Sequence, residues 1–239
     1  MDDIQQQVNE EEIATFYNKV EEIWPSNEPW YKYTKAQIEK FVHKNAFKYH
    51  DYVLNAGSGG YDYNLNCKMH HVDIAAEKIN QLPLYTVASL EKLPFATNTF
   101  DGILCVGSVI NYCDAVAAIV EMARVLKHGG SLLLEYENSF AYEYRSKLCY
   151  KADAQIKSVY QGKEQQQWIY SYKYINRILK ECGLKIISTR KFHIFSALML
   201  DFGKCENDAA WYAKFDVLGS YLPFINNHGS NIIVHCIKL

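Results

Sequence analysis

The chain has 239 residues, enough for one sizeable hydrophobic core or for a core with a smaller lid. Hydrophobic residues make up 49% of the chain and charged residues 22%, a balance typical of a globular protein. The formal net charge of −2 provides no basic surface for nucleic acid, and no apolar run approaches the ~20 residues that span a membrane. We therefore expect neither a nucleic-acid partner nor a membrane-spanning segment.

Two features of the sequence predict a cytoplasmic protein. The first residues, Met1 to Asp3, are acidic and no apolar segment follows them, so we expect no signal peptide. The seven cysteines are an odd number, and the close pair Cys105 and Cys113 lacks the spacing of metal ligands. We interpret all of them as reduced thiols, mostly in the core.

Two helices are predicted before the first strand. Asn9 is expected to cap the first helix, whose apolar residues recur at helical spacing and which Pro25 is expected to end. Thr34 is expected to cap the second helix. Both helices most simply cover the sheet; as an alternative, Tyr17 or Trp30 belongs to a lid over the ligand.

A glycine-rich turn follows the first strand-like run. The apolar residues from Tyr52 to Leu54 predict a short buried strand, and Gly57, Gly59 and Gly60 come shortly after it. Glycine lets the backbone turn tightly and lets a ligand approach without meeting a Cβ atom. A strand entering such a turn is typical of the nucleotide crevice of an open α/β sheet, although an ordinary turn has the same composition.

An acidic residue lies at the end of the second predicted strand, over residues 70–74. In dinucleotide-binding folds a carboxylate here accepts hydrogen bonds from ribose hydroxyls, which predicts that role for Asp73. Only 14 residues separate Gly59 from Asp73, where about 20 are usual, so we expect the first crossover helix to be short or missing. His70 and His71 point to opposite faces of a strand, so we expect no metal site.

The following elements alternate between strand and helix. Strands are predicted at residues 84–87, 102–106 and 131–135, the second of them apolar enough for a buried central position. Asp114 is expected to cap a helix that reaches Leu126, with Lys127 and His128 at its C-terminal end and Gly129-Gly130 after it. This alternation predicts a doubly wound α/β domain.

Four segments in this order resemble the class I S-adenosylmethionine-dependent methyltransferases, and are most similar to the group called methyltransferase type 11. They are residues 53–59, Val72-Asp73, residues 91–95 with Phe100-Asp101, and residues 126–130. The resemblance implies a Rossmann-like seven-stranded sheet, mostly parallel, with the last strand antiparallel. It also implies a helix over residues 171–182 and two further strands, at residues 184–187 and 231–237.

The resemblance implies a cofactor, S-adenosyl-L-methionine, and a set of residues that bind it. We expect contacts from Asn55, Ala56, Gly57, Ser58, Gly59, Asp73, Ile74, Ser89, Leu90, Val106 and Gly107. In this family the first glycine turn meets the methionine end of the cofactor, and the acid after the second strand holds the ribose. The residue after that acid and the pair at 89–90 lie at the adenine, while the pair at 106–107 lies beneath the sulfonium.

Three positions depart from the family pattern and support an alternative function. Asn55 stands where the family usually has an acid, Tyr61 at the usual third glycine, and Ser89 where an aspartate often binds adenine. A residue lost from a hydrogen-bond pair typically costs about 0.5–1.5 kcal/mol, so two such losses weaken binding by up to roughly a hundredfold. The alternative is therefore a non-catalytic cofactor-binding or scaffold protein. A nicotinamide-dependent oxidoreductase is disfavoured, because Asp62 occupies the last position of G-x-G-x-x-G.

The remaining segments are expected to bind the acceptor. We expect one domain over residues 1–239, with a helical cover at 1–48, a cofactor-binding core at 49–137, and aromatic-rich insertions at 138–170 and 192–229 that form a substrate cap.

The predicted reaction is methyl transfer to a small-molecule or other uncharged acceptor. The methyl group of a sulfonium is already activated, so the reaction requires few catalytic residues and needs a base only where the acceptor loses a proton. Tyr112 and His193 are the residues that the pattern places near the methyl group. For each of them a packing role is the simpler interpretation, and no catalytic residue is assigned.

Overall fold

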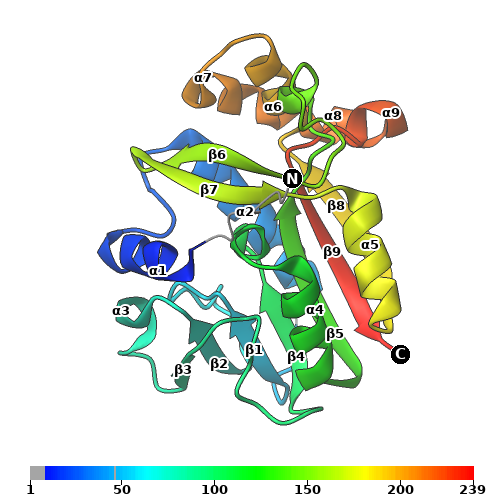
Figure 1. Ribbon diagram of the computed structural model, residues 1–239. Coiled ribbons are helices and arrows are strands. Elements are labelled where there is room, and N and C mark those ends of the chain that lie inside the picture. The colour runs from blue at the N-terminus through cyan, green and yellow to red at the C-terminus, as the bar shows by residue number, and fades with distance from the viewer. Residues whose placement is uncertain (1–8, 46) are drawn as a thin grey trace, which may run out of the picture.

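Seven strands form one mixed sheet in the computed structural model, which describes residues 9–45 and 47–239 (Figure 1). The strand order is β3-β2-β1-β4-β5-β9-β8, and β9 runs antiparallel to β5 and β8 while the other pairs are parallel. The bounds are β1 Tyr52–Ala56, β2 Lys68–Asp73, β3 Tyr85–Val87, β4 Phe100–Cys105, β5 Leu126–Glu137, β8 Leu184–Phe192 and β9 Asn231–Lys238. The fold class predicted from the sequence is confirmed. The acidic start, Met1 to Asp3, lies outside the described residues.

Helices cover both faces of this sheet. Helices α4 (Ala115–Val125) and α5 (Tyr172–Glu181) pack on one face, in a core that includes Ile119, Leu132 and Ile178. Helix α2 (Pro29–Lys44) packs on the other face, where Ile38 meets Leu104 and Leu133. The central strands are buried on both sides, which explains their nearly continuous apolar sequence.

Several helix ends follow the predicted caps. The Asp114 carboxylate accepts hydrogen bonds from the N–H groups of Val116 and Ala117, so it starts α4 as expected. Asn9 in the same way caps α1 (Glu10–Lys19). Ser171, for which no cap was predicted, begins the helix expected at residues 171–182 and caps α5. These caps are local, because each is formed by a side chain and the N–H groups of the first turn.

Three predicted boundaries are wrong. Helix α1 ends at Lys19, well before Pro25. Helix α2 begins at Pro29, because proline fits the first turn of a helix, and Thr34 lies inside it. Helix α4 ends at Val125 and the chain enters β5 directly, so residues 127–130 belong to the strand and not to a helix end.

The connection between β1 and β2 contains no helix among its described residues, as the short spacing predicted. Aromatic residues occupy the space instead. Tyr63 is buried with α2, and the Tyr61 hydroxyl donates a hydrogen bond to the Glu39 carboxylate at 2.6 Å. The Asn55 amide donates to the Tyr61 carbonyl oxygen at 2.7 Å and fixes the loop against β1.

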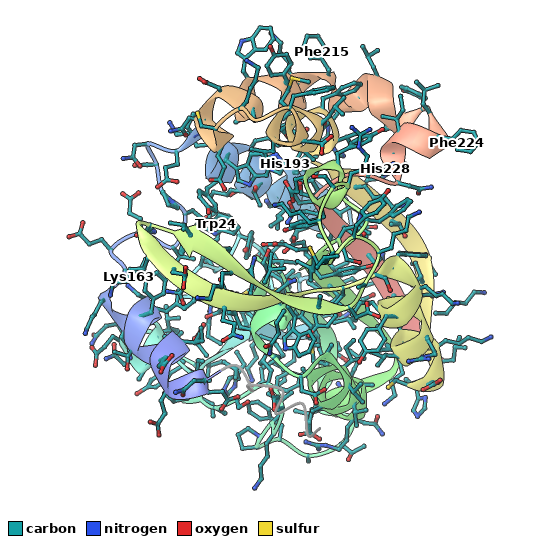
Figure 2. The ribbon with its side chains drawn as sticks, turned by 45° about the horizontal axis from the view of Figure 1, so that its top comes forward. Trp24, Lys163, His193, Phe215, Phe224 and His228 are labelled. Atoms are coloured by element: carbon teal, nitrogen blue, oxygen red, sulfur yellow. The ribbon has the colours of Figure 1, made fainter. Side chains whose placement is uncertain are left out.

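The two predicted insertions fold into separate elements above the carboxyl edge of the sheet (Figure 1). Residues 138–170 contain the short helix η2 (Tyr142–Tyr144) and the hairpin of β6 (Ala154–Tyr160) and β7 (Lys163–Ile169). The second insertion forms α6 (Ile194–Asp201), α7 (Glu206–Ala210), η3 (Trp211–Phe215), α8 (Asp216–Ser220) and α9 (Pro223–Asn226). Figure 2 shows Phe215 and Phe224 on the outer side of these helices.

Two short helices complete the fold, α3 (Ala76–Ile79) after β2 and η1 (Val109–Tyr112) after β4. In the described parts of the chain, every helix is too short or too polar to cross a bilayer.

Candidate functional site

A cavity of about 640 Å³ runs along the carboxyl ends of β2, β1, β4 and β5. Most of the predicted cofactor-binding residues line it, from the four turns that follow β1, β2, β3 and β4. They are Gly57, Ser58, Gly59, Asp73, Ile74, Ser89, Leu90, Val106 and Gly107. A volume of this size is within the range of cavities that enclose small ligands.

Two predicted residues do not line the cavity. Asn55 is 2% exposed, and its amide is used by the carbonyl oxygen of Tyr61. Ala56 is fully buried in the core between the sheet and α4. Both belong to β1 itself, which is covered on either side by neighbouring strands, so the cavity begins only at the glycine turn.

A single carboxylate connects the first two turns. Asp73 accepts a hydrogen bond from the Gly59 N–H at one oxygen and from the Ala75 N–H at the other, both at 2.8 Å. The N–H groups of Gly57 and Ser58 donate to the carbonyl oxygen of Val72 at 2.7 and 3.1 Å. Burial raises the pKa of Asp73, while the backbone donors lower it. The geometry holds a carboxylate at the cavity wall with lone pairs remaining on both oxygens.

Gly57 cannot be replaced without displacing its neighbours. Its φ angle is +70°, and a Cβ atom there would lie 2.2 Å from Cγ1 of Val109. We expect Gly57→Ala to destabilise the fold by about 2 kcal/mol, from the left-handed backbone and the overlap together. Thermal unfolding would measure this, with Gly162→Ala as the control. That glycine has a similar φ of +75° but free space around it, so an equal loss in both variants would refute the steric part.

A buried glutamate holds the turn after β4. Glu135 in β5 is fully buried, and one carboxylate oxygen accepts hydrogen bonds from the N–H groups of Gly107 and Ser108 at 2.9 and 2.6 Å. The other oxygen accepts from the Asn231 amide at 2.7 Å. Burial raises the pKa of Glu135, and these donors lower it. Glu135 is not among the residues predicted from the sequence, although an acid within an apolar strand indicates a buried, hydrogen-bonded role.

The open side of the cavity is covered by the N-terminal segment and the hairpin. Glu10 and Tyr17 of α1 line the cavity, and the Ser89 hydroxyl donates to Glu10 at 2.5 Å. At the hairpin tip, the Tyr160 hydroxyl donates to the carbonyl oxygen of Ile23 at 2.7 Å. Figure 2 shows Trp24, another lining residue, beside this hairpin. Helix α1 and the hairpin tip pack against each other through Phe16, Tyr17 and Tyr160, and together they cover part of the cavity opening.

The aromatic residues of the insertions are distributed unequally. Tyr144 and Tyr160 of the first insertion line the cavity. The second insertion contributes only Leu200, Asp201 and Glu206, and its aromatic residues lie elsewhere. Tyrosines and tryptophans of the N-terminal segment also line the cavity. The aromatic wall therefore comes from the N-terminal segment and the first insertion, and not from both insertions as expected.

The two residues considered as bases have different surroundings. Tyr112 lines the cavity, its ring centroid is 5.9 Å from that of Tyr17, and burial raises its pKa. His193 does not line the cavity. Its Nε2 lies 2.8 Å from the Thr34 hydroxyl and its Nδ1 lies 2.8 Å from the Ser196 hydroxyl, while burial lowers its pKa to about 3. His193 therefore joins α2 to α6, as Figure 2 also shows, and offers no free nitrogen to the cavity.

A second acid, only partly buried, lines the cavity two residues beyond Glu135. The Glu137 carboxylate accepts a hydrogen bond from the Gln167 amide at 2.8 Å. Burial, with the nearby acids Glu143, Glu135 and Glu206, raises the pKa of Glu137 to about 8. The folded state therefore holds a proton that the unfolded chain releases above pH ~4.5, so stability falls as pH rises towards 8.

We expect Glu137→Gln to remove this loss of stability. The amide keeps the shape and an acceptor for Gln167 but carries no charge at any pH. At pH 9 the variant should exceed the wild type by about 2 kcal/mol in unfolding free energy, with little difference at pH 5. Urea unfolding at both pH values measures the difference. An equal stability of the two proteins at pH 9 would contradict the raised pKa.

Comparison with known proteins gives the family of this site. The family model described as a methyltransferase domain matches residues 49–134. An uncharacterised protein of Methanocaldococcus jannaschii is 29% identical over 143 residues, which cover 53% of this chain and 61% of the relative. The ubiquinone/menaquinone biosynthesis C-methyltransferase UbiE of Saccharophagus degradans is 47% identical over 51 residues, 21% of this chain and 20% of the relative. The chain thus matches less than two thirds of the length of either relative.

A solved structure is similar over the whole chain. The geranyl diphosphate C-methyltransferase of Streptomyces coelicolor, in complex with Mg²⁺, geranyl diphosphate and S-adenosyl-L-homocysteine, has a TM-score of 0.61 and 11% identity. The similarity covers 96% of this chain and 98% of that one, and at such low identity it shows the fold. Residues 49–134 therefore match a methyltransferase domain, and the chain has the class I fold of S-adenosylmethionine-dependent methyltransferases, which confirms the resemblance and the cofactor predicted from its motifs.

Proposed function

We propose that this protein transfers the methyl group of S-adenosyl-L-methionine to a small-molecule acceptor bound in the same cavity. The observation that carries the proposal is that one continuous cavity extends from the glycine turn and Asp73 to the end of β5. The cofactor-binding turns line one part of it. The other part is lined by side chains of the insertions and of the N-terminal helices, which leaves room for an acceptor next to the cofactor.

The residues at the glycine turn fit the cofactor. Asp73 would hold the two ribose hydroxyls, because each of its oxygens has a lone pair beyond the one used by a backbone N–H. Ile74 and Leu90 would pack on the adenine, and the backbone of Gly57 and Ser58 would meet the methionine end. Asn55 would act only indirectly, by fixing the loop that follows.

The reaction needs positioning more than chemical assistance. The bound cofactor supplies a methyl group that is already electrophilic. Glu135 fixes the turn at Gly107 and Ser108, which would lie beneath the reacting atoms. Holding a nucleophile and a methyl group in line can supply about 7–11 kcal/mol of the barrier. Helix α1 and the hairpin tip cover part of the cavity opening.

The scale of the cavity favours a small acceptor. A volume of about 640 Å³ accommodates a nucleoside-sized cofactor with a compact second molecule, and the contact of the hairpin with the N-terminal segment narrows the opening. The similar structure from Streptomyces coelicolor carries geranyl diphosphate, which is also a small molecule.

Calorimetry and a turnover assay test the proposal together. Titration should give saturable binding of S-adenosylmethionine and S-adenosylhomocysteine, and none of NAD. Transfer of a labelled methyl group to compounds below about 500 Da would support the proposal. Binding of the cofactor without any transfer would favour a non-catalytic scaffold, and binding of NAD alone would contradict the cofactor site.

A further inference from the structure

The part of the cavity beyond Glu135 is unusually acidic. Three carboxylates line it, Glu137 at the end of β5, Glu143 in η2 and Glu206 at the start of α7. Residues 135 and 137 of one strand share a face of the sheet. Glu137 therefore lies on the same side as Glu135, which holds the turn expected beneath the methyl group.

The three carboxylates lack cationic partners within the described residues. None of the ion pairs found there includes Glu137, Glu143 or Glu206. Their mutual repulsion and burial raise the pKa of Glu137 to about 8 and that of Glu143 to about 7, and Lys147 lowers the latter only in part. Such a cluster is destabilising on its own, and a bound cation would relieve it.

A second observation points to a ligand at this place. Ser230 lines the same part of the cavity and is 4% exposed, yet its hydroxyl completes no hydrogen bond among the described residues, although it lies close enough to the Glu143 carboxylate to lower the pKa of that group. Aromatic rings complete the wall, with Tyr31 and Tyr160 packed edge to face at 5.1 Å and Trp30 nearby on α2. Ring faces together with carboxylates are the surroundings that favour an organic cation.

We propose that the methyl acceptor is a small basic amine, whose nitrogen faces Glu137 and Glu143. This inference rests on the proposed function. The amine would enter as an ammonium ion and give a proton to a carboxylate of the pair. Its freed lone pair would then form the bond to the methyl carbon while the bond from that carbon to sulfur breaks. The products are a methylated ammonium ion and the neutral thioether.

A diphosphate acceptor, as in the similar C-methyltransferase structure, fits this cavity less well. Unpaired carboxylates repel a diphosphate at short range. A bridging Mg²⁺ ion would reverse this repulsion, but the described residues contain no group of three His, Cys, Asp or Glu side chains arranged to hold a metal ion. Addition of Mg²⁺ is nonetheless one arm of the test.

The first experiment does not require the acceptor to be known. The full-length protein is incubated with methyl-tritiated S-adenosylmethionine and a deproteinised small-molecule extract, and with a defined set of tyramine, spermidine and benzylamine. After removal of the cofactor, labelled product retained by a cation exchanger at pH 7 supports the inference. Label confined to neutral or anionic products, or label that appears only with Mg²⁺, overturns it. No labelled product despite cofactor binding overturns the proposed function as well.

The second experiment uses conservative variants. Glu137→Gln and Glu143→Gln keep the shape of the cavity but remove the charge, and each should lower kcat/KM for the amine at least about thirtyfold, mainly through KM. Glu181→Gln, an exposed acid at the end of α5, is the matched control and should change nothing. If both variants weaken binding of S-adenosylmethionine but not of S-adenosylhomocysteine, whose sulfur is neutral, the carboxylates serve the sulfonium and the inference fails.

Discussion

Replacing Asp73 by alanine is expected to weaken binding of S-adenosylmethionine by about a hundredfold or more. The carboxylate would lose its bonds to the two ribose hydroxyls, and charge-assisted hydrogen bonds contribute about 1.5–3 kcal/mol each. The N–H groups of Gly59 and Ala75 would also lose their acceptor, so the glycine turn and the start of α3 would no longer be held together. Calorimetric titration of the variant with S-adenosylmethionine and S-adenosylhomocysteine measures the effect.

Two further variants separate the cofactor contact from a general effect of the charge. Asp62 lies in the same loop region but is exposed, and its carboxylate accepts only from the nearby Asn64 N–H. Asp62→Ala should therefore leave the affinity within about twofold. Asp73→Asn keeps one acceptor oxygen and should fall between the two. An Asp73→Ala protein that is folded by circular dichroism and binds the cofactor normally would refute the assigned role.

Replacing Glu135 by alanine is expected to produce the largest loss of stability, about 3 kcal/mol, together with loss of turnover. Three buried donors, on Gly107, Ser108 and Asn231, would be left without an acceptor, and each such group costs about 1–3 kcal/mol. Removal of a buried carboxylate recovers part of that cost, which limits the net effect. Urea unfolding measures stability, and methyl transfer measures the consequence for the turn after β4.

The variant Glu135→Gln tests whether the shape or the charge of this side chain holds the turn after β4. Glu135→Gln retains one oxygen for Gly107 and Ser108, but its amide would face the donor on Asn231. We expect about half of the stability to return and turnover to recover partly. Glu181→Ala on the exposed end of α5 is the control. A Glu135→Ala protein as stable as the wild type would show that the turn is held by something else.

The parts of the fold that depend on short-range patterns could be predicted from the sequence. Asn9, Asp114 and Ser171 cap helices through bonds to the following turn, and the glycine turn after β1 is defined within a few residues. The central strands could be predicted from their apolar runs, because a strand that is buried on both faces has apolar residues at successive positions. The position of Asp73 at the cavity wall could be predicted in the same way, because it depends only on the strand that ends at this residue.

The errors arise where contacts between distant segments decide the outcome. Thr34 has the composition of a cap, but α2 extends past it to Pro29, and its hydroxyl meets His193, far away in the sequence. The β6–β7 hairpin was expected only as an insertion, because its strands are rich in glutamine and lysine and one face meets the cavity. The roles of Glu135 and Glu137 depend on turns and insertions that no local pattern places beside β5.

The connection from β1 to β2, in which the structure describes no helix, places the residues at positions 55 and 61 in contact with each other. The side-chain amide at 55 donates to the main-chain oxygen of residue 61, whose own phenol reaches helix α2. Restoring the acid common in the family at 55 would set a carboxylate oxygen against that carbonyl oxygen, and restoring the glycine at 61 would remove the anchor on Glu39. Either reversion alone should therefore be harmful, and a protein with an acid at 55 or a glycine at 61 should hold this loop less firmly against β1 and α2.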